Sequence, residues 1–251
     1  MAQATPDVPV RLDSWADTPE FLDLLHLTNP AFVPDPAHAA ALLAGVRAQG
    51  TRGRHLEALG CIYYAASRLG ETVGLKLRDC ELPRRGWGML RLNESRARSG
   101  TAWTDSGEAH DQRGLKHRSR KAVRYVPIPP ELVALLRWHV IRFGTAPDGR
   151  LFRTARGGMV QESGYGEAWA RARADVLTSG ELASRLAKRP YDLRHAAVST
   201  WLSSGVEPQL VAERAGHSVA VLFRAYAKFL KGGDEAANAK ISARLRAGGP
   251  S

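Results

Sequence analysis

This sequence has few cysteines, no long apolar run and no metal-binding pattern. Only two cysteines, Cys61 and Cys80, occur in 251 residues, which rules out a disulfide framework and a four-thiolate zinc site. No apolar run approaches the roughly 20 residues that a membrane span needs. The N-terminus has neither the basic nor the apolar segment of a secretory signal. These absences exclude disulfide-rich secreted and membrane-spanning classes, and they make a reducing cytoplasm the expected compartment.

Motifs for metal-dependent and nucleotide-dependent chemistry are missing as well. The eight histidines form no HExxH pattern, and the Cys and His spacings match no zinc motif. The sequence has no GxxxxGK[ST] phosphate loop, no GxGxxG after a predicted strand and no GxSxG turn. The sequence therefore predicts neither a metal site nor a cofactor.

The charge is strongly basic and unevenly distributed. Lys and Arg number 36 against 25 Asp and Glu, a net charge of +11. Residues 1–40 hold one base and six acids, so residues 41–251 hold 35 bases and 19 acids, a net charge of +16. Such a surplus attracts polyanions, and counterion release makes nucleic acid the expected partner. On charge alone, a solvated arginine-rich surface is the alternative explanation.

Periodicity divides the chain into three parts. Residues 1–36 are acidic and rich in proline, which predicts an irregular arm with one short helix near 20–27. Residues 37–230 carry the ordered pattern, and 231–251 predict a tail with one helix at 235–246. The fold class predicted for 37–230 is mainly α with a small antiparallel β-sheet. The predicted helices are 37–49, 55–67, 71–77, 131–143, 163–177, 181–187, 192–203, 208–215 and 218–230, the predicted strands are 88–92 and 122–128, and 93–121 predicts a hairpin with an extended tip.

Arginine, histidine and tyrosine stand at the edges of predicted helices. Arg68 lies at a helix break, three residues before Glu71. Arg194 lies in the first turn of the helix after Pro190, and Tyr226 follows His217 by nine residues. Two guanidiniums can hold the non-bridging oxygens of a phosphate, and a phenol can attack phosphorus. These residue types therefore suit phosphoryl transfer without a metal.

Four segments, in this order, resemble the sequence boxes of the tyrosine recombinases, the phage integrase family. ASRLGETVGLKLRD (66–79) resembles the Arg-x-x-Glu first box, and PYDLRHAAVSTWLSSGV (190–206) resembles the His-x-x-Arg second box. ERAGHSVAVLFRAYAKF (213–229) is similar to the segment from Gly-His-Ser to the nucleophilic tyrosine. VRYVPIPPELVALLRWH (123–139) looks like the strand and helix after the catalytic-lysine hairpin. The resemblance covers 37–230 and implies the catalytic-domain fold of that family.

The resemblance implies a site-specific recombinase that cleaves and rejoins DNA strands through a 3′-phosphotyrosine, without metal or ATP. Tyr226 would attack the scissile phosphate, Arg68 and Arg194 would hold its non-bridging oxygens, and His217 would donate to the same phosphate. The implied partners are double-stranded DNA and further copies of the chain, as a tetramer on paired sites. The implied place of action is the nucleoid within the cytoplasm.

A lysine of the predicted hairpin would protonate the leaving 5′-oxygen. We expect Lys116, because the family lysine lies several residues before an Arg-x-Val-Pro strand, and Lys121 is the alternative. Glu71 would position Arg68, and His195 is expected to be a structural hydrogen-bond partner. The basic residues expected to contact DNA phosphates are Arg113, Arg118, Arg120, Lys121 and Arg124.

The sequence departs from the family pattern at two places. Tyr191 stands where family members usually have histidine. A tyrosine can donate a hydrogen bond to phosphate, but its ordinary pKa of about 10 makes it a poor acid or base near neutral pH. Family members also usually carry a helical core-binding domain before the catalytic domain, where this chain has the arm 1–36. The chain is therefore expected to be a catalytic domain alone, as a natural short form or a fragment.

Residues 201–226 also fit a helix-turn-helix with short turns between helices. That interpretation makes the protein a non-catalytic DNA-binding protein, and it leaves Arg68 and the lysine hairpin unexplained. A degenerate integrase that binds DNA without turnover is a third interpretation. Only a catalytic recombinase forms a covalent adduct with DNA, so the adduct separates the three.

Overall fold

The computed structural model describes residues 31–50, 56–92, 95–98, 110–113, 123–226 and 234–247. The short helix predicted near 20–27 lies outside the described residues. The helices are α2 (Pro36–Ala48), α3 (Leu56–Tyr64), α4 (Leu69–Gly74), η2 (Leu77–Asp79, a 3-10 helix), α5 (Pro130–Phe143), α6 (Glu162–Val176), α7 (Ser179–Ala183), α8 (Asp192–Ser203), α9 (Pro208–Ala215), α10 (Val219–Tyr226) and α11 (Asp234–Ala247). The strands are β1 (Cys80–Glu81), β2 (Gly88–Leu92), β3 (Ser95–Arg98), β4 (His110–Arg113) and β5 (Arg124–Ile128).

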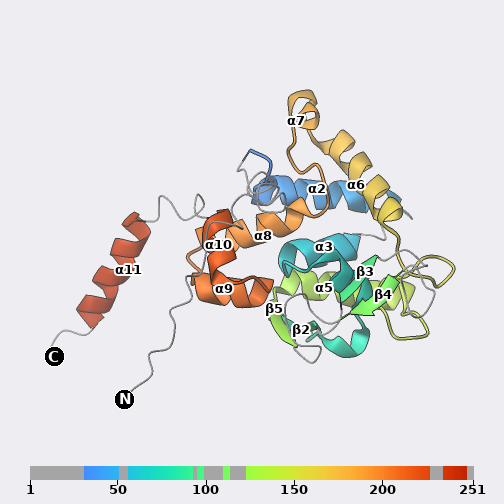
Figure 1. Cartoon of the computed structure of the whole chain (residues 1–251), viewed down its shortest axis with the longest axis horizontal. Coiled ribbons are helices and arrows are strands. Elements are labelled where there is room, and N and C mark those ends of the chain that lie inside the picture. Colours follow the sequence, from blue (N-terminus) through green and yellow to red (C-terminus); the bar gives the residue numbers. More distant parts are fainter. Residues whose placement is uncertain are drawn as a thin grey trace, which may run out of the picture.

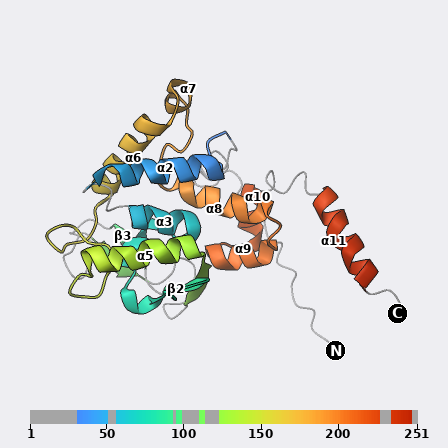
Figure 2. The same ribbon diagram turned by 180° about the vertical axis from the view of Figure 1, so that it is seen from behind.

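The elements form a mainly helical fold with a small antiparallel sheet, as the sequence predicts. Figures 1 and 2 show α2 and α6 on one side, strands β2 and β5 on the other, and α3 and α5 between them. Helices α8, α9 and α10 form one end of this body, and α11 lies apart from the other elements in both views. Within the described part of the chain, none of the helices combines the length and the apolar character of a membrane span.

Helix α2 begins where the sequence provides a cap and a proline. The Asp35 carboxylate accepts a hydrogen bond from the His38 backbone N–H at 2.8 Å, and Pro36 takes the first helical position, where its missing N–H costs nothing. The buried face of α2 packs on α3 and α6 through Leu42, Val46 and other apolar side chains. Burial of these side chains fixes α2 beside α6, on the side of α3 away from the sheet.

The three-stranded sheet has the order β1-β2-β5, with all pairs antiparallel. Leu90 of β2 pairs with Val126 of β5, and both side chains are fully buried. They lie in one apolar cluster with Leu132 and Leu136 of α5, so this helix covers the sheet. Strands β3 and β4 pair antiparallel as a second sheet, which confirms the hairpin predicted within 93–121. The tip of that hairpin, 99–109, lies outside the described residues.

The helices α8, α9 and α10 share a third apolar cluster, which includes Val198, Leu202, Val211 and Leu222. Helix α9 also packs against β5. This packing brings the turn after α9 to the edge of the sheet and to the break between α3 and α4. The predicted residues Arg68, Arg194, His217 and Tyr226 lie at this junction.

Three predicted helices differ from the structure, and the first, predicted at 55–67, ends at Tyr64 as α3. The helix predicted at 181–187 is the shorter α7, because Thr178 and Glu181 form a capping box that starts it earlier, and Ala187 has a left-handed backbone with φ 49°. The predicted helix at 71–77 is divided into α4, which starts at Leu69, and the 3-10 helix η2. These differences change where helices start, end or divide, and the fold class stays as predicted.

Candidate active site

Arg68 stands where the chain turns from α3 into α4. Ala66, in the turn, has a left-handed backbone with φ 45°, an uncommon conformation for a residue with a side chain. Arg68 is the N-cap residue of α4, and its backbone N–H donates to Glu71 Oε2 at 2.8 Å. Its Nη1 donates to Glu71 Oε1 at 2.9 Å. The short helix therefore fixes both the backbone and the guanidinium of Arg68.

Glu71 is a buried carboxylate among guanidiniums. Its side chain has no exposed surface, and Oε2 also accepts a hydrogen bond from Nη2 of Arg124 on β5. Burial raises the pKa of Glu71, but Arg124, Arg194 and Arg68 outweigh burial and lower it below its usual value. Glu71 therefore stays ionised and holds two guanidiniums in place.

Arg194 lies in the first turn of α8 with no exposed surface. It donates from Nη1 to the Ala66 carbonyl and from Nη2 to the Ala215 carbonyl at 2.6 Å. The left-handed turn at Ala66 thus directs a carbonyl toward this arginine. Arg68 donates from Nη2 to the next carbonyl, that of Gly216, at 2.6 Å. The two arginines of the predicted clamp therefore bind consecutive carbonyls at the end of α9.

Gly216 ends α9 in a left-handed conformation, with φ 67° and ψ 40°. A Cβ atom added here would lie 3.1 Å from Nε of Arg124 and 3.2 Å from Nη1 of Arg68. The position therefore needs glycine both for its backbone and because two guanidiniums pass close to it. This turn is what lets α9 end against the arginines.

His217 follows that glycine, and Nη2 of Arg194 lies 2.8 Å from its Nε2. A guanidinium can only donate, so Nε2 accepts and the ring hydrogen is on Nδ1. Burial and the charges of Arg194 and Arg68 lower the pKa of His217 to about 2, which keeps the ring neutral. Its Nδ1 is buried and has no hydrogen-bond partner among the described residues.

Tyr226 ends α10 and is fully buried. Its Oη lies 2.6 Å from Nδ1 of His195 on α8. Its ring stacks on that of His217, with centroids 6.2 Å apart and an interplanar angle of 23°. Burial raises the pKa of Tyr226 above the ordinary value for tyrosine. The phenol is therefore protonated near neutral pH, and it is held between the two histidines.

Tyr191 is half-buried at the start of α8, and its ring meets that of His195 edge-on at 5.5 Å between centroids. The departure from the family pattern therefore lies directly beside the histidine that contacts Tyr226.

The structure brings together the seven predicted catalytic and supporting residues that it describes, and it adds to them Arg124, which was predicted only as a DNA contact. Arg124 was expected to contact DNA phosphates, but its side chain is about 1% exposed and is held by Glu71 and by the Arg214 carbonyl. The apolar spacing of β5 could have indicated this, because Arg124 lies on the same face as Val126 and Ile128, which are buried. The residues brought together are Arg68, Glu71, Tyr191, Arg194, His195, His217 and Tyr226.

Other predicted residues are not placed by the structure. Lys116 and Lys121, the two candidates for the general acid, lie outside the described residues, as do Arg118 and Arg120. Arg113 ends β4, and its side chain is outside the described part. The proton donor to the leaving oxygen therefore stays a prediction.

The cluster has the charge and the donors that a phosphate diester requires. Three guanidiniums surround one carboxylate, and Nε of Arg194, like Nδ1 of His217, is buried without a partner among the described residues. Buried donors without partners are costly unless a ligand satisfies them. Both donors lie in the group that holds Tyr226, so an anion bound by them would lie close to the phenol.

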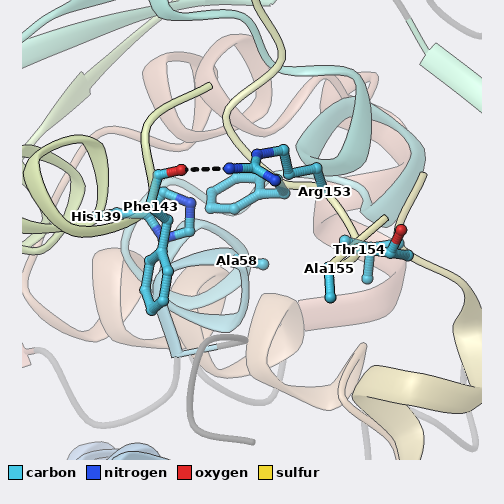
Figure 3. A pocket seen from close by; sticks show the side chains of 8 residues that line it. Ala58, His139, Phe143, Arg153, Thr154 and Ala155 are labelled. Atoms are coloured by element: carbon cyan, nitrogen blue, oxygen red, sulfur yellow. Dashed lines mark hydrogen bonds between the residues drawn. The ribbon is translucent and has the colours of Figure 1, made fainter. Parts of the chain in front are cut away.

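A separate cavity of about 220 Å³ lies between α3, α5 and the chain after Leu151. Figure 3 shows its lining, in which Nη2 of Arg153 donates to the Phe143 carbonyl at 2.7 Å. His139 also lines it and pairs with the buried Glu57 at 3.1 Å. None of the eight residues that line this cavity belongs to the arginine and histidine cluster.

No protein-family model matches this sequence, and no curated protein is similar to it. Solved structures are similar to it in fold. The Tn1549 transposon integrase, in complex with transposon right-end DNA, has 20% identity and a TM-score of 0.66, and the match covers 87% of this chain and 67% of the integrase. The XerH site-specific recombinase bound to its difH substrate has 14% identity and a TM-score of 0.56, covering 77% of this chain and 50% of XerH.

The XerA recombinase has 18% identity and a TM-score of 0.55, and the match covers 80% of this chain and 63% of XerA. This chain thus spans between half and about two thirds of the length of these recombinases. The match includes most of this chain, with its three-stranded antiparallel sheet and the surrounding helices. The chain has the fold of the tyrosine recombinase catalytic domain.

Proposed function

We propose that the protein cleaves and rejoins DNA strands through a covalent 3′-phosphotyrosine at Tyr226. The observation that carries the proposal is the placement of Tyr226 between His195 and His217, with His217 bound to Arg194 at 2.8 Å. A phenol, two arginines and a neutral histidine thus come from three separate segments to one place. Of the three proteins of the same fold, one is a transposon integrase and one a site-specific recombinase, both bound to DNA, and the third, XerA, is a recombinase.

In this mechanism Arg68 and Arg194 hold the non-bridging oxygens of the scissile phosphate. A guanidinium has five N–H donors, so those not directed at Glu71 and the α9 carbonyls can donate to phosphate. Nδ1–H of His217 is a further donor. The charge that develops on these oxygens in the pentacoordinate transition state is therefore matched by preorganised donors, as in an oxyanion hole.

Attack of the Tyr226 oxygen on phosphorus forms the O–P bond and breaks the bond to the 5′-oxygen, which leaves as a hydroxyl once it is protonated. Lys116, or Lys121, would supply that proton. The phosphotyrosine ester keeps the bond energy, so rejoining is the reverse attack by a 5′-hydroxyl and needs no ATP. Because Tyr226 is buried, DNA binding has to open the cluster enough for phosphorus to reach the phenolic oxygen.

The partner in this proposal is double-stranded DNA, attracted by the net charge of +16 on residues 41–251. Strand exchange between two sites needs a nucleophile at each of four strands, so the active form is a tetramer of copies of this chain on paired sites. The affinity for DNA should fall steeply with salt concentration, because phosphate contacts release counterions. The setting of this reaction is the nucleoid.

A suicide-substrate experiment tests the proposal. The probe is a pool of short duplexes with randomised arms and one nick, so that a cleaved end is lost by diffusion. We expect a protein–DNA adduct that resists denaturation, formed in excess EDTA and without ATP. Sequencing of the trapped DNA gives the preferred site. If no adduct forms in the pool or on fragments of genomic DNA, the proposed function is wrong.

A further inference from the structure

His195 lies in contact with the reacting atom of the proposed nucleophile. Its Nδ1 is 2.6 Å from Oη of Tyr226, and the ring is 2% exposed. The two side chains come from α8 and α10, which pack together in one apolar cluster. His195 is also the residue next to Arg194, so the contact lies beside the predicted phosphate clamp. The sequence indicated only a structural hydrogen bond for this histidine.

A phenol that attacks phosphorus has to lose its proton, and the other groups of the cluster are poorly suited to accept it. Tyr191 is itself a phenol and a weak base. His217 has its lone pair on Nε2 directed at Arg194. Both oxygens of Glu71 accept hydrogen bonds from Arg68 and Arg124. The imidazole of His195 offers Nδ1 at hydrogen-bond distance from the phenol.

We propose that His195 is the general base of strand cleavage, the group that accepts the phenolic proton of Tyr226 through Nδ1. This proposal rests on the proposed function. It gives the role of proton acceptor to His195, since the phenol of Tyr191 is a poor base near neutral pH. During cleavage the O–H bond of Tyr226 breaks, its proton goes to Nδ1, and its electron pair forms the O–P bond. The bond from phosphorus to the 5′-oxygen breaks, and the general acid protonates that oxygen. During rejoining the imidazolium returns its proton to the departing phenolate.

The surroundings of His195 couple this step to DNA binding. Burial, together with the charges of Arg194 and Arg189, lowers the pKa of His195 to about 3, so the free protein holds a neutral ring with a lone pair available. The same charges oppose formation of the imidazolium. A phosphate diester bound at Arg194 brings a negative charge that offsets them. A phosphate in the clamp therefore opposes the effect of Arg194 and Arg189 on the pKa of His195 and makes proton acceptance easier than in the free protein.

Substitution by asparagine separates proton acceptance from positioning. The amide oxygen of His195→Asn can lie near the former Nδ1 and accept a hydrogen bond from Tyr226, but an amide does not take up the proton. We expect single-turnover cleavage of the trapped DNA site to fall by about 10²-fold or more, within the usual range for loss of a general base. DNA affinity and melting temperature, measured in parallel, show that the variant is folded. If His195→Asn does not fold, His195→Gln takes its place in the same assay.

A fluorinated tyrosine at position 226 supplies the decisive comparison. Ring fluorination makes the phenol a stronger acid, so the nucleophile ionises without help. We expect it to restore cleavage by His195→Asn to within about tenfold of the wild-type rate, and to change the wild-type rate little. His139→Asn is the matched control, because His139 is also buried and its two ring nitrogens lie 3.1 Å from Glu57 Oε2 and 3.0 Å from the Leu151 carbonyl oxygen. It should cleave at about the wild-type rate.

Two results would overturn the assignment. Cleavage by His195→Asn within about threefold of wild type would show that no base is needed at this position. Slow cleavage that fluorination does not restore would show that His195 only positions Tyr226. In both cases the wild type still forms its adduct, so the proposed function stands. Absence of any adduct in the wild type refutes the proposed function itself, which is a different outcome.

Discussion

Substitution of Gly216 by alanine should disturb the arginine cluster more than it disturbs the fold. The residue has φ 67°, where an alanine costs about 1–2 kcal/mol relative to glycine. The new Cβ would lie 3.1 Å from Nε of Arg124 and 3.2 Å from Nη1 of Arg68, so both guanidiniums have to shift by a few tenths of an ångström. A misplacement of 1 Å can cost 10²-fold in rate, so we expect cleavage to fall about tenfold.

Gly50→Ala is the matched control. Gly50 has a similar φ of 61°, but nothing lies within 4 Å of an added Cβ. Both variants should lose about 1–2 kcal/mol of unfolding free energy in urea. Only Gly216→Ala should lose cleavage in a single-turnover assay at saturating protein. Equal cleavage by the two variants, within about threefold, would show that the approach of the guanidiniums to Gly216 has no part in catalysis.

Three further predictions concern the clamp, the general acid and acid stability. Arg68→Lys and Arg194→Lys should each reduce cleavage by about 10²-fold or more, because an ammonium cannot hold two phosphate oxygens as a guanidinium does. A cleavage rate within about threefold of wild type in either variant would show that the substituted arginine is not part of the site. Lys116→Ala should cleave ordinary DNA slowly but cleave a 5′-thio substrate at nearly the wild-type rate, because a thiolate leaves without protonation. Rescue by the 5′-thio substrate in Lys121→Ala instead would make Lys121 the general acid. His195 has a folded pKa of about 3, below its unfolded value of 6.5, so the unfolded chain binds its proton first as pH falls. Lowering the pH from 7 to 5 should therefore lower the unfolding free energy of the wild type by about 2 kcal/mol through His195. In urea titrations at the two pH values, the loss of unfolding free energy should be smaller by this amount in His195→Asn.

The helices near the site were predictable because their ends carry local signals. Pro208 at the first position and Gly216 at the end define α9, and the observed helix has the predicted bounds. The strand β1 was missed, since two residues, Cys80 and Glu81, give no periodicity. At α7 the Thr178 and Glu181 capping box was a local signal that the prediction did not use, and the helix starts two residues before the predicted position.

The contacts within the cluster were only partly predictable. The spacing of Arg68 and Glu71 places them one helical turn apart, which allows the observed ion pair. The burial of Arg124 depends on α9 packing against β5, a contact 90 residues away in sequence. The hydrogen bond between His195 and Tyr226 likewise joins residues 31 positions apart. Such contacts follow from tertiary packing, which periodicity in one segment does not encode.

The most direct test of the central claim is to identify the residue that becomes linked to DNA. After trapping on a nicked substrate and proteolysis, mass spectrometry should find a 3′-phosphate ester on Tyr226. Tyr226→Phe should bind DNA almost as well as the wild type, since one oxygen contributes little to phosphate-dominated binding, and should form no adduct. Tyr125→Phe, at a tyrosine that is 57% exposed on β5, should form the adduct normally. An adduct that persists in Tyr226→Phe, or that maps to another residue, would contradict the account.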